Sequence, residues 1–214
     1  MASRLVLVDD TDPNIQYSDS WALAQNTQLS TGTNGPPYQN TLHGTAANHS
    51  SFSYSFNGMP RWLVCFIAPS LAYGCFSGTQ ITVLGSSITT NTSATNNTSA
   101  TQDPTWECFV DNISIGWHIS AGTRTENNWV LCQSDLKDGH HVLTTNVTIL
   151  HQQPFWFDQI QYLPSSGVAP ANSSVRVDSS DSAIRYSSGW GEYSGIVNLT
   201  QTAGSTVTFD FLGP

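Results

Sequence analysis

The sequence predicts an all-β fold: an antiparallel jelly-roll β-sandwich in residues 1–165, followed by a partial second copy of that domain in residues 174–214. Charged residues make up only 10% of the chain, and no stretch is dense in the Ala, Leu, Glu, Lys and Arg that long helices need. Many short runs alternate between apolar and polar residues, as strands with one buried face do. The opening stretch of the chain also recurs near its end, which places the domain boundary.

The predicted strands follow one another at short, regular spacing, with turn residues between them. TWECFVDNISIGW contains two strands around an Asp-Asn turn, and DLKDG forms another turn. The low-complexity run 89–103 is expected to be an exposed loop. The remaining predicted strands lie in residues 3–10, 14–21, 50–56, 79–86, 128–134, 140–150 and 155–164.

An internal repeat defines the domain organisation. LVLVDDTDPNIQYSDSW (5–21) aligns without a gap to SVRVDSSDSAIRYSSGW (174–190), with identical residues at 8 of 17 positions. The match resumes at 41–46 against 198–203, and at 52–58 against 207–213. The chain is therefore expected to hold one whole domain and the opening of a second, joined by a Ser/Pro/Ala linker at 166–173.

An apolar block, MPRWLVCFIAPSLAYGCFSG (59–78), interrupts this polar chain after the residue equivalent to the end of the second copy. It is short for a membrane span and contains Pro69 and Gly74. A buried hairpin insertion is a second interpretation. We favour a third, a retained intron, because Gly-Met and Phe-Ser-Gly can encode splice donor and acceptor sequences. Deleting the block would join SFSYSFNG to TQITVLGSS, which predicts a hairpin across a tight Asn57-Gly58 turn.

Charge and sequons restrict the partners and the compartment. A net charge of −9 argues against nucleic-acid binding through phosphates and against a basic membrane-binding patch. The start, MASRLVLVDD, is not a signal peptide. Either a signal was removed, or the start is wrongly assigned, or the protein is intracellular; we favour the first two, which place the protein at the cell surface or outside the cell. Glycosylation is expected at eight Asn-x-Ser/Thr sequons, Asn48, Asn91, Asn96, Asn97, Asn112, Asn146, Asn172 and Asn198. In such a compartment Cys108 and Cys132 are expected to form a disulfide.

Five stretches of the chain together match a known pattern: VDDTDPNIQYSDSW, PTWECFVDN, ENNWVLCQS, DGHHVLTTNV and FWFDQIQYLPS. They resemble the recurrent ectodomain of uncharacterised surface proteins of agaric (basidiomycete) fungi. The resemblance implies a galactose-binding-domain-like jelly roll, with two such domains, a polar stretch and one membrane span in the usual arrangement. The family carries no established activity, and glycan binding follows only by analogy with other sandwiches of this type. The block 59–78, the missing rest of the second copy and the absent signal and span depart from the pattern.

Acids on the first and last strands suggest a structural Ca²⁺, as in related carbohydrate-binding jelly rolls. The candidate ligands are Asp9, Asp10, Asp12 and Asp158. The second copy has Ser179 where the first has Asp10, so either Asp10 is the weaker candidate or only the first copy binds metal. The alternative is that these aspartates cap turns.

Tryptophans beside polar residues are the candidate sugar platforms, because an aromatic face stacks on the apolar face of a sugar ring. Trp129, which follows Asn127 and Asn128, is the first candidate and Trp106 the second, with core packing as the alternative. Trp21 and Trp156 are predicted to lie in the core.

No catalytic signature is present. His140 and His141 adjoin on a strand and so face opposite sides, which argues against a shared metal. The sequence therefore predicts a non-enzymatic ectodomain that recognises a cell-wall glycan or another surface ligand. A structural or adhesive wall protein is the alternative, a glycoside hydrolase is a third, and the partial second copy is a candidate for self-association.

Overall fold

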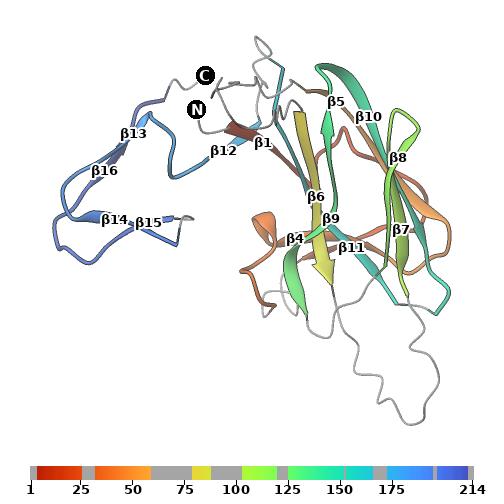
Figure 1. Ribbon diagram of the computed structural model, residues 1–214. Helices are drawn as coiled ribbons and strands as arrows, with labels where there is room; N and C mark the ends of the chain where they lie inside the picture. The colour runs from red at the N-terminus through yellow and green to blue at the C-terminus, as the bar shows by residue number, and fades with distance from the viewer. Residues whose placement is uncertain are drawn as a thin grey trace, which may run out of the picture.

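The computed structural model describes residues 4–25, 32–58, 79–87, 103–119, 125–151, 153–165, 173–194 and 197–211. The fold is an all-β, jelly-roll-type sandwich of two antiparallel sheets, as predicted (Figure 1). No α-helix occurs in these ranges, only a 3-10 turn, η2 (Tyr38–Asn40). Within them, no helix is long and apolar enough to cross a membrane. The apolar block 59–78 lies outside the described residues.

The first sheet is organised around β11. Strand β6 pairs with one edge of β11, while β1 and β4 share the other edge; β9 lies beyond β6, β3 beyond β4, and β12 beyond β1. All of these pairings are antiparallel. The strands of this sheet are β1 (Arg4–Asp9), β3 (Ala22–Gln25), β4 (Thr41–Thr45), β6 (Thr79–Ser87), β9 (Glu126–Leu136), β11 (Phe155–Tyr162) and β12 (Ser174–Val177).

The second sheet has the order β2-β5-β10-β7-β8 and covers the first. Its β7–β8 hairpin turns at Asp111-Asn112, as predicted, and both residues have positive φ, at 53° and 64°, which suits a tight hairpin turn. The strands are β2 (Gln16–Tyr17), β5 (Ser50–Gly58), β7 (Thr105–Val110), β8 (Ile113–Ile119) and β10 (Gly139–Thr148).

The core fills the space between the sheets with alternate side chains of each strand. Phe52 of β5 stacks on Phe157 of β11, with ring centroids 4.3 Å apart, and both are buried. Every side chain of the core cluster belongs to the stretch between Val6 and Tyr162. The first copy therefore has a hydrophobic core to which the described residues of the second copy contribute no side chain.

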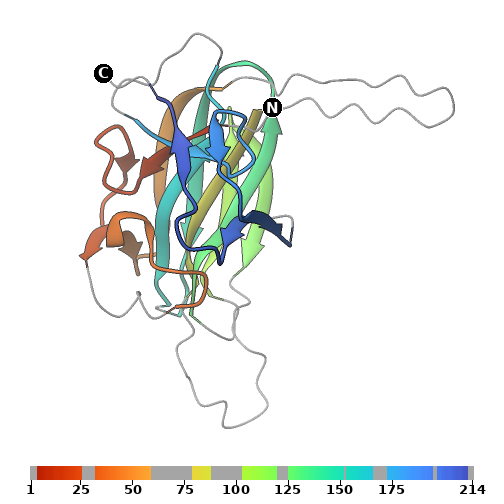
Figure 2. The ribbon, with the colours of Figure 1, turned by 90° about the vertical axis from the view of Figure 1, so that its left-hand side faces the viewer.

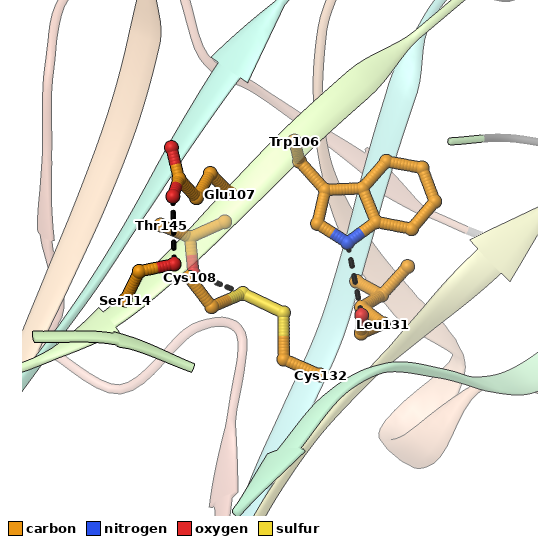
Figure 3. Close-up of a disulfide and its surroundings, with 7 residues drawn as sticks. All are labelled: Trp106, Glu107, Cys108, Ser114, Leu131, Cys132 and Thr145. Atoms are coloured by element: carbon orange, nitrogen blue, oxygen red, sulfur yellow. Dashed lines mark hydrogen bonds between the residues drawn. A yellow bond between two sulfur atoms is a disulfide. The ribbon is translucent and has the colours of Figure 1, made fainter. Parts of the chain in front are cut away.

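The predicted disulfide is confirmed. Cys108 of β7 is bonded to Cys132 of β9, with their Cα atoms 6.5 Å apart and neither side chain exposed (Figure 3). Because β7 and β9 belong to different sheets, the bond joins the two layers through the core.

In this chain β5 and β6 do not pair as the hairpin across Asn57-Gly58 that is expected if residues 59–78 are deleted. Strand β5 pairs with β10 and β2 in one sheet, whereas β6 pairs with β9 and β11 in the other. The chain therefore crosses between the layers after Gly58 instead of turning back on itself. The local Asn-Gly signal is outweighed by the partners that both strands find far along the sequence.

After β12, the second copy forms two separate small sheets beside the sandwich (Figures 1 and 2). Its apolar side chains are largely exposed: Leu199 is 39% exposed and Phe211 76%, whereas the aligned residues Leu42 and Phe56 are buried. The described part of this copy includes no counterparts of β6 to β11, which cover the equivalent side chains in the first copy. Its strands after β12 are β13 (Ile184–Tyr186), β14 (Trp190–Tyr193), β15 (Val197–Thr200) and β16 (Val207–Phe209), paired as β13–β16 and β14–β15.

Candidate functional site

A recess opens at the end of the sandwich where β6 ends and β7, β9 and β11 begin. It is a small surface recess, with about 320 Å³ of empty space that includes open solvent at its mouth. Three tryptophans contribute to it, one from each of three strands. Its lining consists of Ser86, Ser87, Pro104, Trp106, Trp129, Leu131, Pro154, Phe155 and Trp156.

Trp129 is the exposed aromatic of this recess. It lies on edge strand β9 opposite Gly85 of β6, and 40% of it is exposed. The pairing of β6 with β9 shifts register on both sides of this point, and Val130 is exposed as well, at 45%. The irregular pairing breaks the usual alternation of side chains, so that Trp129 and Val130 both face solvent.

Trp156 forms part of the recess as a second indole, contrary to the sequence prediction that it lies in the core. Its neighbours Phe155 and Phe157 point inward, so Trp156 points out of the same strand and packs over Gly44 of β4, its pairing partner. A Cβ at Gly44 would overlap the Trp156 ring. The absence of a side chain at Gly44 is therefore what makes room for this indole.

Two polar side-chain atoms of the recess lining are shielded from solvent. The indole Nε1 of Trp156 and the hydroxyl Oγ of Ser87 are shielded from solvent and have no hydrogen-bond partner within the described ranges. A shielded N–H or O–H without a partner gains a hydrogen bond when a ligand hydroxyl reaches it. In the described part of the chain, the recess thus combines apolar aromatic faces with two shielded donors that have no partner.

Trp106, predicted as a second sugar platform, is a core residue. Only 4% of it is exposed, its ring packs on Phe155 with centroids 5.4 Å apart, and its Nε1 donates a hydrogen bond of 2.9 Å to the Leu131 carbonyl (Figure 3). It forms the floor of the recess and leaves no ring face free for stacking. Trp21 also packs against the core, as predicted, with Phe52 and Phe155 at its edges.

The predicted ligand amides, Asn127 and Asn128, instead anchor a loop. Asn127 is completely buried; its Nδ2 donates to the Gly35 carbonyl at 2.9 Å and its Oδ1 accepts from Ser86 Oγ at 2.8 Å. Asn128 donates to the carbonyls of Asn34 and Pro36. Both side chains therefore position the loop 34–36, and Trp129 alone remains exposed among the four predicted ligand-binding residues.

Three predicted calcium ligands are buried acids at the junction of β1 and β11. Asp10 and Asp158 are fully buried, and Asp9 is 8% exposed. Asp158 accepts the Tyr38 backbone N–H at 3.0 Å; burial, together with the charges of Asp10 and Asp9, raises its pKa to about 8. Burial also raises the pKa of Asp10 to about 6, although hydrogen bonds from Thr41 and His43 oppose this.

In this geometry the four aspartates do not fit a calcium site. Both oxygens of Asp10 are already bonded, to Thr41 Oγ1 and His43 Nδ1, and Asp12 caps its own turn by accepting the Asn14 N–H. Asp9 Oδ1 is buried without a hydrogen-bond partner. Within the described ranges, no three acidic, histidine or cysteine side chains gather closely enough to share a metal. Calcium binding stays a prediction from the sequence.

The histidine pair behaves as expected from strand geometry. His140 is exposed, whereas His141 is 8% exposed on the other face of β10. His141 is hydrogen-bonded to Asp111 Oδ2 at 2.7 Å and to the Lys137 carbonyl at 2.8 Å. Burial lowers the pKa of His141, but these two bonds outweigh it and the net shift is upward. This histidine holds the β7–β8 turn against β10.

The described sequons differ in exposure. Asn48, Asn112 and Asn146 are exposed, and Asn198 is half-buried with its Nδ2 donating to the Ser179 carbonyl. The other four sequons lie outside the described residues. Their glycosylation stays a prediction.

No family model matches the chain, and none of the curated proteins is similar to it in sequence. Among solved structures, the carbohydrate-binding module CBM36 in complex with calcium and xylotriose has a TM-score of 0.37 at 14% identity, over 73% of this chain and 98% of the module. The CBM36-1 domain of a multidomain xylanase from the hindgut metagenome of Trinervitermes trinervoides has a TM-score of 0.35 at 12% identity, over 70% of this chain and all of that domain. The catalytic domain of a GH87 alpha-1,3-glucanase in complex with nigerose has a TM-score of 0.38 at 11% identity, over 78% of this chain and 28% of that chain. At these TM-scores the matches decide nothing about the ligand of this chain.

Proposed function

We propose that this chain is a non-enzymatic glycan-recognition domain of a fungal surface protein, exposed outside the cell, and that it binds sugar rings at the recess beside Trp129. The observation that carries the proposal is the composition of the recess. An exposed indole adjoins a second indole, Trp156, whose N–H has no partner in the described part of the chain. A sugar ring presents both complementary features, an apolar C–H face and hydroxyl groups.

Each side chain has a separate role in this proposal. Trp129 stacks on the C–H face of the ring, because its exposed face needs no rearrangement to be reached. Trp156 Nε1 and Ser87 Oγ bond ring hydroxyls after a small movement that opens them to the recess. Trp106 and Phe155 keep the floor rigid through their contact in the core. The described lining contains no Asp or Glu, so these residues offer binding groups and no acid–base pair for hydrolysis.

The experiment is a glycan array that includes fungal wall polysaccharides, followed by depletion of the protein with each insoluble polysaccharide that gives a signal. It is run with calcium and with chelator, and release of reducing sugar is measured in parallel. Trp129→Ala is expected to weaken binding roughly thirtyfold, the loss typical of an aromatic anchor, while Trp129→Tyr keeps most of it.

The matched control is Ile113→Ala. Ile113 is 71% exposed at the β7–β8 turn, at the opposite end of β7 from the recess, so its removal leaves binding unchanged. Equal binding by wild type and Trp129→Ala would overturn the proposed site. A folded protein that binds no glycan would overturn the function and favour the structural or adhesive alternative. Sugar release would favour the hydrolase.

A further inference from the structure

The two copies of the repeat contact each other through equivalent strands. Strand β12 pairs antiparallel with β1, and the register sets Val6 opposite Val175. These two valines are also aligned with each other in the internal repeat. An antiparallel pair centred on equivalent residues has local two-fold symmetry, which is the geometry of a self-complementary contact.

The turns that follow the two strands share one conformation. Asp12 N–H donates to the Asp9 carbonyl at 3.0 Å, and in the second copy Asp181 N–H donates to the Asp178 carbonyl at 2.9 Å. The aligned tyrosines also match, since Tyr17 and its counterpart each donate their hydroxyl to a backbone carbonyl seven residues earlier. The first copy can therefore present to a partner the same strand and turn that the second copy presents here.

An ion pair reinforces this contact on one side only. The Arg4 guanidinium bonds both oxygens of Asp181, at 2.8 and 3.1 Å, and Asp181 is 6% exposed. By symmetry the opposite pair would join position 173 to Asp12, but residue 173 is a serine. Asp12 accordingly forms no ion pair within the described ranges. By contrast, if the first copies of two molecules paired in this way, each would supply both Arg4 and Asp12.

We propose that the β1 edge is a self-association edge. Its partner is the β1 strand of another molecule's first copy, residues 1–165. The two strands pair about a two-fold axis at Val6, with each Arg4 bonded to the partner's Asp12. In the 214-residue chain β12 occupies this edge and holds that contact within one molecule. Removing the second copy exposes the β1 backbone groups, and an exposed edge pairs readily with a matching strand.

The test compares residues 1–165 with the full chain. The core cluster lies entirely between Val6 and Tyr162, so the shorter chain keeps everything that its fold buries. Sedimentation velocity over a concentration series is expected to show a dimer for residues 1–165 and a monomer for residues 1–214. Near-UV circular dichroism confirms that both are folded. A folded 1–165 that stays monomeric at every concentration overturns the proposal.

Charge reversal tests the ion pairs. In residues 1–165, Arg4→Glu and Asp12→Arg are each expected to weaken the dimer roughly tenfold or more, because each change sets two like-charged pairs at the interface in place of two attractive ones. An equimolar mixture of the two variants restores the dimer as a heterodimer. Failure of the mixture to recover would refute the Arg4–Asp12 contact.

Cysteine pairs test the register. In this structure Leu5 lies opposite Arg176, which is aligned with Leu7 in the repeat, and Leu7 lies opposite Ser174, which is aligned with Leu5. In the two-fold arrangement Leu5 of one chain therefore lies opposite Leu7 of the other. A mixture of Leu5→Cys and Leu7→Cys chains should therefore form a disulfide-linked heterodimer, and neither chain should crosslink with itself. Crosslinking of Leu5→Cys alone would show another register and overturn the proposed one.

A full-chain variant keeps the proposal testable if residues 1–165 fail to fold. Val175→Pro removes a backbone donor from β12 and disfavours its pairing with β1. This variant is expected to dimerise through the freed edge, and adding Arg4→Glu should reverse the effect. A Val175→Pro chain that is folded and monomeric contradicts the inference.

Discussion

Replacing Asp158 tests how the sandwich tolerates a buried acid. Burial, with the charges of Asp10 and Asp9, raises the pKa of Asp158 to about 8 from its ordinary 3.8. The native protein therefore holds a proton that the unfolded chain releases, so its free energy of unfolding falls as the pH rises from about 4 to about 8. About 3 pH units separate 3.8 from neutrality, and each unit corresponds to about 1.4 kcal/mol. At pH 7 the buried Asp158 carboxyl therefore lowers the free energy of unfolding by about 4 kcal/mol.

Asp158→Asn removes this pH-dependent destabilisation, because an amide does not ionise, and it keeps an oxygen that can accept the Tyr38 N–H. The variant is expected to gain up to about 4 kcal/mol relative to wild type between pH 4 and pH 7. Urea unfolding followed by tryptophan fluorescence, at a series of pH values in chelator, measures the difference. Asp135→Asn, on the exposed face of β9, is the matched control and should follow the wild-type profile.

Two results would refute the reasoning. Parallel pH profiles for wild type and Asp158→Asn would mean that Asp158 is ionised in the native state at no cost. A calcium-dependent gain in wild-type stability that Asp158→Asn abolishes would mean that a cation neutralises this cluster, and that the acids converge more closely than the described geometry shows.

Two other changes test packing in the sandwich. Replacing Cys108 and Cys132 together by alanine should lower the free energy of unfolding by about 3 to 4 kcal/mol, because the disulfide closes a loop with a sequence separation of 24. Guanidinium unfolding measures this difference, and an unchanged unfolding midpoint would contradict the prediction. Gly44→Ala places a methyl group against the ring of Trp156. It should lower the free energy of unfolding by about 1–3 kcal/mol and weaken glycan binding. A variant that is destabilised but binds normally would show that Trp156 is not part of the binding site.

Strand positions could be predicted from the sequence because alternation is a local property. Residues 50–56 and 79–86 alternate clearly, and both lie in strands, β5 and β6. Alternation specifies which side chains share a face, but not which strand lies alongside. The partner of β5 is β10, more than 80 residues away, and nothing in the local sequence of β5 indicates this pairing. For that reason the pairing of β5 could not be predicted from the sequence.

The site shows the same division between local and distant information. Trp129 could be found because it follows a polar stretch at the start of a strand. The roles of Asn127 and Asn128 could not, because the loop carbonyls to which they donate, in residues 34–36, lie more than 90 residues away. Trp156 was predictable in principle: if Phe155 and Phe157 face the core, the residue between them faces outward. The space above Gly44 depends on the pairing of β11 with β4.

The recess and the β1 edge can act together because they occupy different parts of β11. The recess adjoins the start of that strand, at Phe155 and Trp156, whereas β1 pairs with its end, from Gln159 to Tyr162. Pairing through β1 therefore leaves the recess open, and the two-fold axis gives the proposed dimer two such recesses. Two linked sites bind a repetitive polysaccharide with higher avidity than one, because the second contact becomes intramolecular. Glycan recognition and self-association are thus compatible in the sandwich of residues 1–165, where β12 does not occupy the β1 edge.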